Sequence, residues 1–142
     1  MVNTKTDKVY AIEGEVGQVY LNSIFVARLL KDDKILIKHL IMGMLLDSDC
    51  HFAKDMKIYG VDFFKLYINE LCNVSAEKKL NPLFVTKGEN VKDAIVKHVD
   101  YSSDRYIVVS EEVRNLIDSS NYQLSKLEES IKRFYFPNTL RN

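Results

Sequence analysis

The chain has 142 residues, with 20 Lys and Arg balancing 20 Asp and Glu, and it contains only two cysteines. This length suffices for one hydrophobic core without disulfides or a metal, so we expect a single domain over residues 1–142. Because the net charge is zero, there is no overall attraction to nucleic acid or to anionic lipid, and neither is a predicted partner. The N-terminus carries charges where a signal peptide needs an apolar stretch, so we expect a cytoplasmic protein with reduced thiols.

The first half of the chain begins with a polar stretch, 1–8, and a predicted short extended segment at 9–12. A helical period starts at Gly14 and ends at the polar break 31–34. The next run, 35–46, is apolar on nearly every side and predicts the central, most buried helix. Since this run is only about half as long as a membrane span, we interpret it as a core helix. The first helix is predicted to bury a face of apolar and small residues: Val16, Val19, Tyr20, Ser23, Ala27 and Leu30.

Turn and cap signals predict two more helices. The acidic turn 47–49 offers N-cap residues for a third helix over 50–58. Gly60 suits a left-handed cap at the end of that helix. Asp62 suits the N-cap of a fourth helix over 63–71.

The second half of the chain is introduced by a predicted linker, 73–88, which is polar and contains Asn-Pro and Lys-Gly pairs. Asn90 is a suitable cap for a short helix reaching His98. Residues 106–109 are rich in β-branched side chains and are predicted to be extended. Ser110, followed by two glutamates, is a good helix start because acids favour the positive end of the helix dipole.

Beyond Ser110 the pattern predicts one long helix, or two helices joined near Asn121, and a loose tail over 137–142. Glu-Lys and Glu-Arg pairs four residues apart are expected on its exposed side. The buried face is predicted to consist of residues spaced by three and four: Val113, Leu116, Ser120, Leu124, Leu127, Ile131 and Phe134.

Three sequence features occur in a fixed order in the first half. Residues 37–45 read Ile-Lys-His-Leu-Ile-Met-Gly-Met-Leu, Phe52-Ala53 follow, and 60–63 read Gly-Val-Asp-Phe. This order resembles one repeat of the N-terminal domain of Clp-type AAA+ unfoldases. That family typically has threonine-glutamate-histidine before a leucine-rich stretch with one glycine, then paired alanines and a glycine-valine-aspartate-leucine turn. The resemblance covers residues 12–72.

The family domain normally has two such repeats about a pseudo-twofold axis. Residues 109–113 look like the start of a second repeat, but no second histidine- and leucine-rich helix follows, because 122–134 is charged and amphipathic. The fold expected is therefore mainly α, a Clp N-domain-like helical bundle. It would have one four-helix repeat over 12–72, the linker, and a divergent or partial second repeat over 89–136.

The resemblance implies a non-catalytic protein-recognition module that binds protein substrates or adaptors and works with an AAA+ unfoldase. An alternative is a stand-alone structural or adaptor protein that self-associates, in which a homodimer supplies the missing repeat. A third reading, a hydrolase, needs His39, His51 or His98 beside a nucleophile in a cleft.

The expected protein-binding residues are Lys38, Phe63, Phe64 and Tyr67. Phe63 and Phe64 are consecutive, so one helix cannot turn both into the core, and one of them is expected to pack on the linker or meet a partner. Some family members recognise phosphorylated arginine through the glutamate before the histidine. Lys38 occupies that position here, and its charge repels a guanidinium, so we predict no phosphoarginine binding by that mode.

No catalytic, cofactor-binding or metal-binding residues are predicted. The phosphate-loop pattern is absent, and residues 87–90 are interpreted as a plain turn. The three histidines and two cysteines offer a conceivable zinc set, but only Cys50 and His51 are close in sequence, and neighbours on a helix point in different directions. We interpret His39 as a core histidine bonded to backbone, and Met42 and Met44 as core packing in preference to an adaptable binding surface.

Overall fold

The computed structural model describes residues 14–47, 50–74, 80, 82–99 and 108–137. The predictions for 9–12, for Ser48 and Asp49, for 106–107 and for most of the tail lie outside these residues. The described part is mainly helical, which confirms the predicted class. Its elements are α2 (Gly14–Leu29), β1 (Lys34–Ile35), α3 (Ile37–Leu45), α4 (His51–Ile58), α5 (Phe63–Asn73), α6 (Val91–His98), β2 (Val108–Val109), α7 (Glu111–Ser119) and α8 (Leu124–Tyr135).

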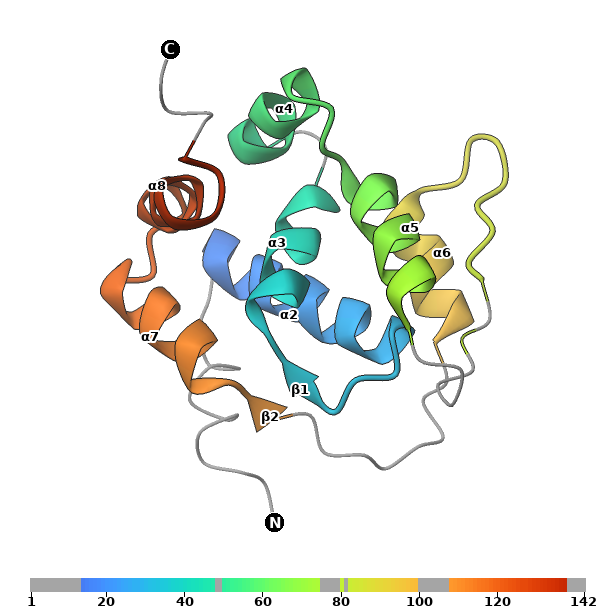
Figure 1. The fold of residues 1–142 in the computed structure, drawn as a ribbon, viewed down its shortest axis with the longest axis horizontal. Helices are drawn as coiled ribbons and strands as arrows, with labels where there is room; N and C mark the ends of the chain where they lie inside the picture. The colour runs from blue at the N-terminus through green and yellow to red at the C-terminus, as the bar shows by residue number, and fades with distance from the viewer. Residues whose placement is uncertain (1–13, 48–49, 75–79, 81, 100–107, 138–142) are drawn as a thin grey trace.

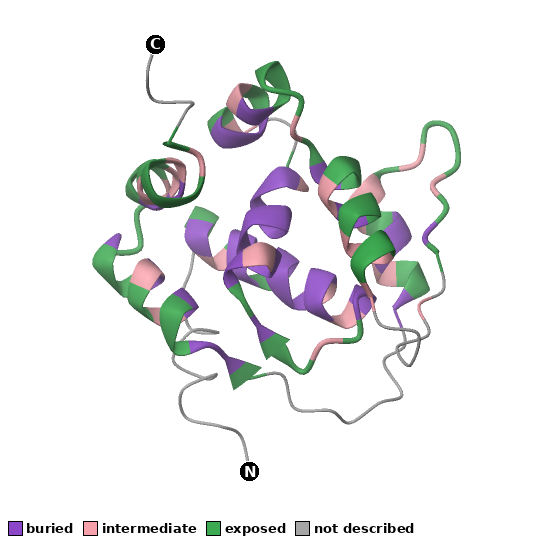
Figure 2. Ribbon diagram, in the orientation of Figure 1, coloured by how far each residue is buried: buried purple, intermediate pink, exposed green. Residues whose placement is uncertain are grey.

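Helix α3 lies at the centre of the molecule, packed along α2 (Figure 1). Helices α7 and α8 lie on one side of this pair, α5 and α6 on the other, and α4 at one end. Eight of the nine residues of α3 are buried, and the buried residues gather in α2 and α3 (Figure 2). The predicted central helix is therefore confirmed, and Met42 and Met44 are core residues.

The α2–α3 contact depends on Gly43. A Cβ atom at this position would lie 2.8 Å from Ser23 Oγ and 2.9 Å from Ser23 N, closer than real side chains approach. The two backbones meet here because glycine has no side chain. Asn22, which is buried, adds a bond by donating from Nδ2 to the Gly43 carbonyl at 3.1 Å.

A short parallel pairing joins the two halves of the chain. Lys34 pairs with Val108 and Ile35 with Val109, and the Ser110 N–H donates to the Ile35 carbonyl at 3.0 Å. The predicted helix over 35–46 is therefore too long at its start, because Ile35 is held extended by β2. Each strand leads directly into a helix, β1 into α3 and β2 into α7.

The stretch beyond Ser110 forms two helices, α7 and α8, joined near Asn121. This is the second of the two predicted arrangements. Asn121 and Tyr122 separate α7 from α8 with left-handed φ values of 54° and 60°. This break divides the predicted stretch into two helices, and Leu127 and Ile131 beyond it are buried as predicted. Phe134, predicted to be buried, is 67% exposed, and Ile117 is buried instead.

Helices α7 and α8 contribute to the same hydrophobic core as α2 and α3. Their buried side chains Val113, Ile117, Leu127 and Ile131 belong to one cluster with those of the first half. The self-association alternative assumed that the first repeat leaves an apolar face uncovered. These four residues cover part of that face within the chain itself.

Most of the predicted caps are confirmed. Gly60 has φ of 77°, Asp62 accepts from the Lys65 N–H at 2.9 Å, and the side chains of Asn90 and Ser110 cap α6 and α7. The cap of α4 differs from the prediction, because Cys50 Sγ accepts from the Ala53 N–H at 3.4 Å. Within the described residues, each helix falls short of the length and apolar character needed to span a bilayer.

Candidate functional site

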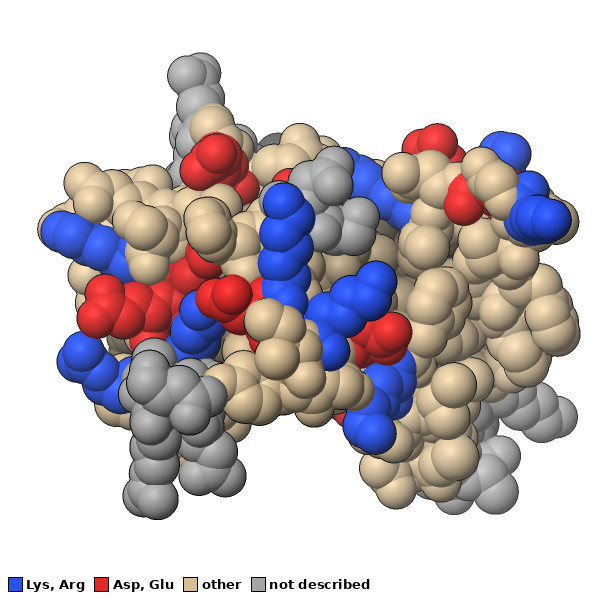
Figure 3. Space-filling model, turned by 90° about the horizontal axis from the view of Figure 1, so that it is seen from above, with Lys and Arg blue, Asp and Glu red and all other residues tan. Residues whose placement is uncertain are grey.

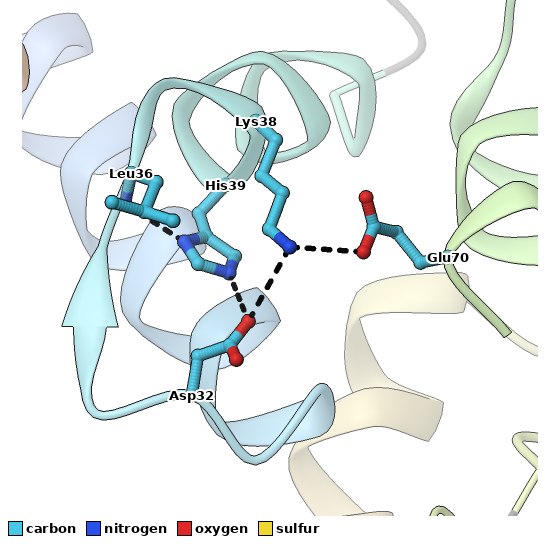
Figure 4. Close-up of polar contacts among 5 residues, drawn as sticks. All are labelled: Asp32, Leu36, Lys38, His39 and Glu70. Carbon is cyan, nitrogen blue, oxygen red and sulfur yellow. Dashed lines mark hydrogen bonds and ion pairs between the residues drawn. The ribbon is translucent and has the colours of Figure 1, made fainter. Parts of the chain in front are cut away.

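The polar residues of the α3 motif form a cluster with the end of α2 and with α5, which we call the His39 cluster: Asp32, Lys38, His39 and Glu70 (Figure 4). His39 Nε2 lies 2.7 Å from Asp32 Oδ2, and Lys38 Nζ lies 2.9 Å from Glu70 Oε2 and 3.8 Å from Asp32 Oδ2. Lys38 therefore lies between two carboxylates, and His39 bonds to one of them. It links the turn after α2 with α3 and α5.

His39 is fully buried, and both of its ring nitrogens are engaged. The Leu36 backbone N–H donates to Nδ1 at 2.8 Å, so Nδ1 must be the unprotonated nitrogen. Nε2 then carries the hydrogen and donates it to Asp32 Oδ2. The prediction of a core histidine bonded to backbone is confirmed, with a carboxylate as the additional partner. A histidine held in this way has no lone pair for removing a substrate proton.

The His39–Leu36 bond also explains how α3 begins. The N-cap residue Leu36 has no side-chain acceptor of its own, and the third helical residue, His39, accepts its N–H instead. This is one half of a capping box, with histidine in the role that Glu or Gln commonly plays. The histidine of the motif therefore has a structural task in this chain.

The positive charge of Lys38 is balanced by carboxylates of the same chain. Its ammonium group pairs with Glu70 from α5, 32 residues away in sequence, and lies near Asp32. No local signal in the sequence connects Lys38 to Glu70. The side chain remains 39% exposed, so it lies at the surface as expected for a contact residue, but as part of an ion-pair network.

The four predicted binding residues differ in how far the structure buries them. Phe63 and Tyr67 are only 4% and 3% exposed, and their rings stack with centroids 5.9 Å apart. They have no surface to offer a partner, and for these two the assignment as direct contacts is corrected: they are core residues. Phe64 is 37% exposed, which confirms that the consecutive phenylalanines face different ways.

Tyr67 holds the linker against α5. Its hydroxyl accepts the backbone N–H of Leu83 at 2.8 Å, and Leu83 is itself buried. Among the described residues, Tyr67 thus makes a hydrogen bond with the linker. The residue after Leu83, Phe84, is 82% exposed. The sequence interpretation missed Phe84, whose only signal is an aromatic residue within a polar segment.

We name the exposed residues Phe64, Ile68 and Phe84 the α5 surface. Phe64 and Ile68 are four residues apart on α5 and therefore share one face of the helix. Ile68 is 55% exposed. Large apolar side chains are thus presented to solvent from a helix whose opposite side is anchored in the core.

Replacing Tyr67 with phenylalanine is expected to loosen the linker. The Leu83 N–H would lose its acceptor inside the protein, so we expect a destabilisation of about 1 kcal/mol. Amide hydrogen exchange at Leu83, followed by NMR, should become faster. Tyr122→Phe is the matched control, because its hydroxyl bonds to Asp118 on α7. Unchanged exchange at Leu83 in Tyr67→Phe would contradict this role.

A cavity of about 460 Å³ lies where α2, α4 and α8 meet. Its described lining combines carboxylates, the Cys50–His51 pair, other polar side chains and apolar ones, with no Lys or Arg among these residues: Glu15, Gln18, Val19, Asn22, Met44, Asp47, Cys50, His51, Leu124, Ser125 and Glu128. Burial raises the pKa of the Cys50 thiol, and the nearby carboxylates of Asp47 and Glu128 raise it further. Burial likewise raises the pKa of Glu128. A thiol in these surroundings is not activated as a nucleophile.

Alkylation should reveal the unreactive character of Cys50. The raised pKa leaves less thiolate at neutral pH, and thiolate is the reacting species. We expect Cys50 to react with iodoacetamide more slowly than the exposed Cys72, on the order of tenfold. Mass spectrometry of the intact chain and its peptides gives both rates in one sample. Faster labelling of Cys50 than of Cys72 would indicate an activated thiol and would support the hydrolase hypothesis.

The described residues contain no group of three or more His, Cys, Asp and Glu side chains arranged to hold a metal ion. Residues 87–90 form a turn in which the Glu89 N–H donates to the Thr86 carbonyl at 3.0 Å, in agreement with the plain-turn prediction. No family model, curated protein or solved structure matches the chain.

Proposed function

We propose that this chain is a non-catalytic protein-recognition module, similar in role to the substrate- and adaptor-binding N-terminal domain of a Clp-type unfoldase. The observation that supports this proposal is the α5 surface. Exposed aromatic and aliphatic side chains on a rigid support are typical of interaction sites, since they bury apolar area without a large loss of conformational freedom.

The rigidity of the α5 surface comes from the residues beneath it. Phe63 and Tyr67 are buried on the neighbouring face of α5, and Tyr67 bonds to the Leu83 N–H, the residue before Phe84. The Lys38–Glu70 pair joins the end of α5 to α3. Each exposed side chain is therefore near in sequence to a residue that is buried or hydrogen-bonded.

The polar groups of the His39 cluster support a structural role over a catalytic one. His39 is closed to solvent and bonded at both nitrogens, and Lys38 and Glu70 pair with each other. In a catalytic site, we would expect a nucleophile or base with an unused hydrogen-bonding direction toward a cleft.

Binding to AAA+ unfoldases and their adaptors tests the proposal. The full chain is immobilised and titrated with a panel of purified unfoldases and adaptors. The triple variant Phe64→Ala, Ile68→Ala, Phe84→Ala is expected to raise the Kd on the order of tenfold or more, because truncating buried anchors removes most of the binding energy. Its melting temperature should stay close to that of the parent chain, since all three side chains are exposed.

Phe134→Ala is the matched control, because Phe134 is 67% exposed and lies on α8, away from the α5 surface. It should leave the Kd unchanged. A loss of binding in Phe134→Ala but not in the triple variant would move the site elsewhere. Absence of saturable binding to every protein, together with turnover of a small substrate, would overturn the proposal.

A further inference from the structure

Lysines without ion pairs border the α5 surface. Lys65 follows Phe64 on α5, and Lys87 lies in the turn after Phe84; both are exposed. Among the described residues, neither of these two lysines belongs to a salt bridge.

The acidic residues nearby are already engaged. Glu70 pairs with Lys38 at 2.9 Å, and Glu89 bonds to Lys97 at 3.3 Å while also accepting from the Thr86 N–H. Asp62 serves as the N-cap of α5. Glu70 and Glu89 therefore have lysine partners within the chain, whereas Lys65 and Lys87 have no such carboxylate partner among the described residues.

The surface view agrees with this distribution. Seen from the α4 side, the end of the molecule that carries α5 and the following segment shows a broad area without charged side chains (Figure 3). Both basic and acidic side chains lie along its border. Exposed apolar side chains with unpaired lysines beside them are complementary to a ligand that is apolar with carboxylates at its edges.

We propose that the α5 surface docks an acidic amphipathic protein segment, one that carries aromatic or aliphatic side chains together with Asp or Glu. This inference rests on the proposed function and names the chemistry of its partner. The apolar side chains of the segment would cover Phe64, Ile68 and Phe84. Its carboxylates would pair with Lys65 and Lys87, whereas a basic segment would meet the same lysines with repulsion.

A protein segment is favoured over an anionic membrane. The chain has no net charge, so attraction to a bilayer would come only from these few lysines. A peptide can place its carboxylates directly beside Lys65 and Lys87.

Peptide selection on the full chain tests the inference. A library of random dodecapeptides displayed on phage is selected on the immobilised protein, and the enriched sequences are synthesised with a fluorophore and titrated by anisotropy. The enriched peptides should combine Asp or Glu with Phe, Leu or Ile. Phe84→Ala and, separately, Lys65→Glu and Lys87→Glu should each weaken binding several-fold. A peptide with its acids changed to Lys should bind Lys87→Glu better than the parent chain.

Lys126→Glu is the matched control, because Lys126 is exposed on α8 and changes the net charge equally. Equal weakening by Lys126→Glu would overturn the inference, since it would show only non-specific attraction. Peptides that need Phe84 but carry no acids would also overturn it, while leaving protein recognition in place. Binding to phosphatidylserine vesicles with no saturable binding of any peptide would overturn the inference. If no unfoldase or adaptor bound the chain either, the proposed function would also be wrong.

Discussion

Replacing Gly43 with alanine is expected to destabilise the protein by about 2 kcal/mol. The new methyl group would lie 2.8 Å from Ser23 Oγ and 2.9 Å from Ser23 N, so α2 and α3 would have to separate. The sign of the effect is diagnostic. In a helix without this contact, alanine in place of glycine stabilises by roughly 1 kcal/mol, because it restricts the unfolded chain.

Urea unfolding of Gly43→Ala, followed by circular dichroism, measures this effect. The double variant with Ser23→Gly provides a control, since it removes Ser23 Oγ but leaves the Ser23 backbone nitrogen and the Val19 carbonyl, 3.1 Å from the added Cβ. We therefore expect the double variant to recover only part of the stability that Gly43→Ala loses. A Gly43→Ala variant more stable than the parent chain would show that the two helices are not in close contact here.

Replacing His39 with alanine is expected to destabilise the protein by about 3 kcal/mol. The change leaves a cavity in the core and removes two hydrogen bonds, those to the Leu36 N–H and to Asp32. The part-buried Leu36–His39 bond is the more important of the two for α3, because it satisfies the N–H of the N-cap residue.

His39→Gln separates the capping role from simple core filling. Glutamine at the third helical position can accept the N-cap N–H, so it should recover part of the stability lost in His39→Ala. His39→Phe fills the space without an acceptor and should not recover it. Urea unfolding of the three variants ranks them. Equal stability of the Phe and Gln variants would mean that packing, and not the cap, accounts for His39.

Local patterns in the sequence predicted most of the helices and their caps. The spacing of apolar residues indicated α2, α3, α5 and α6, and Gly60, Asp62 and Ser110 stand where the structure places caps. These signals act over a few residues, within a single turn of helix. The mainly helical class follows from them, while the finer resemblance to a Clp N-domain remains a proposal.

The errors do not share one physical origin. Ile35 continues an apolar helical pattern but is held extended by Val109, its partner in β2. Phe134 continues the spacing of the buried Leu127 and Ile131 but lies near the end of α8, where it is 67% exposed. Cys50 caps α4 although cysteine is not a preferred cap.

The same division applies to the candidate site. The sequence by itself determined that the α3 motif contains Lys38 and a core histidine, that Phe63 and Phe64 do not both point into the core, and that the net charge is zero. Only the tertiary structure decided that Glu70 neutralises Lys38 and that Tyr67 binds the Leu83 backbone. These contacts decide which apolar side chains stay exposed. They join residues far apart in the chain, and the free energy that selects them comes from burial and hydrogen bonds made only when the helices pack.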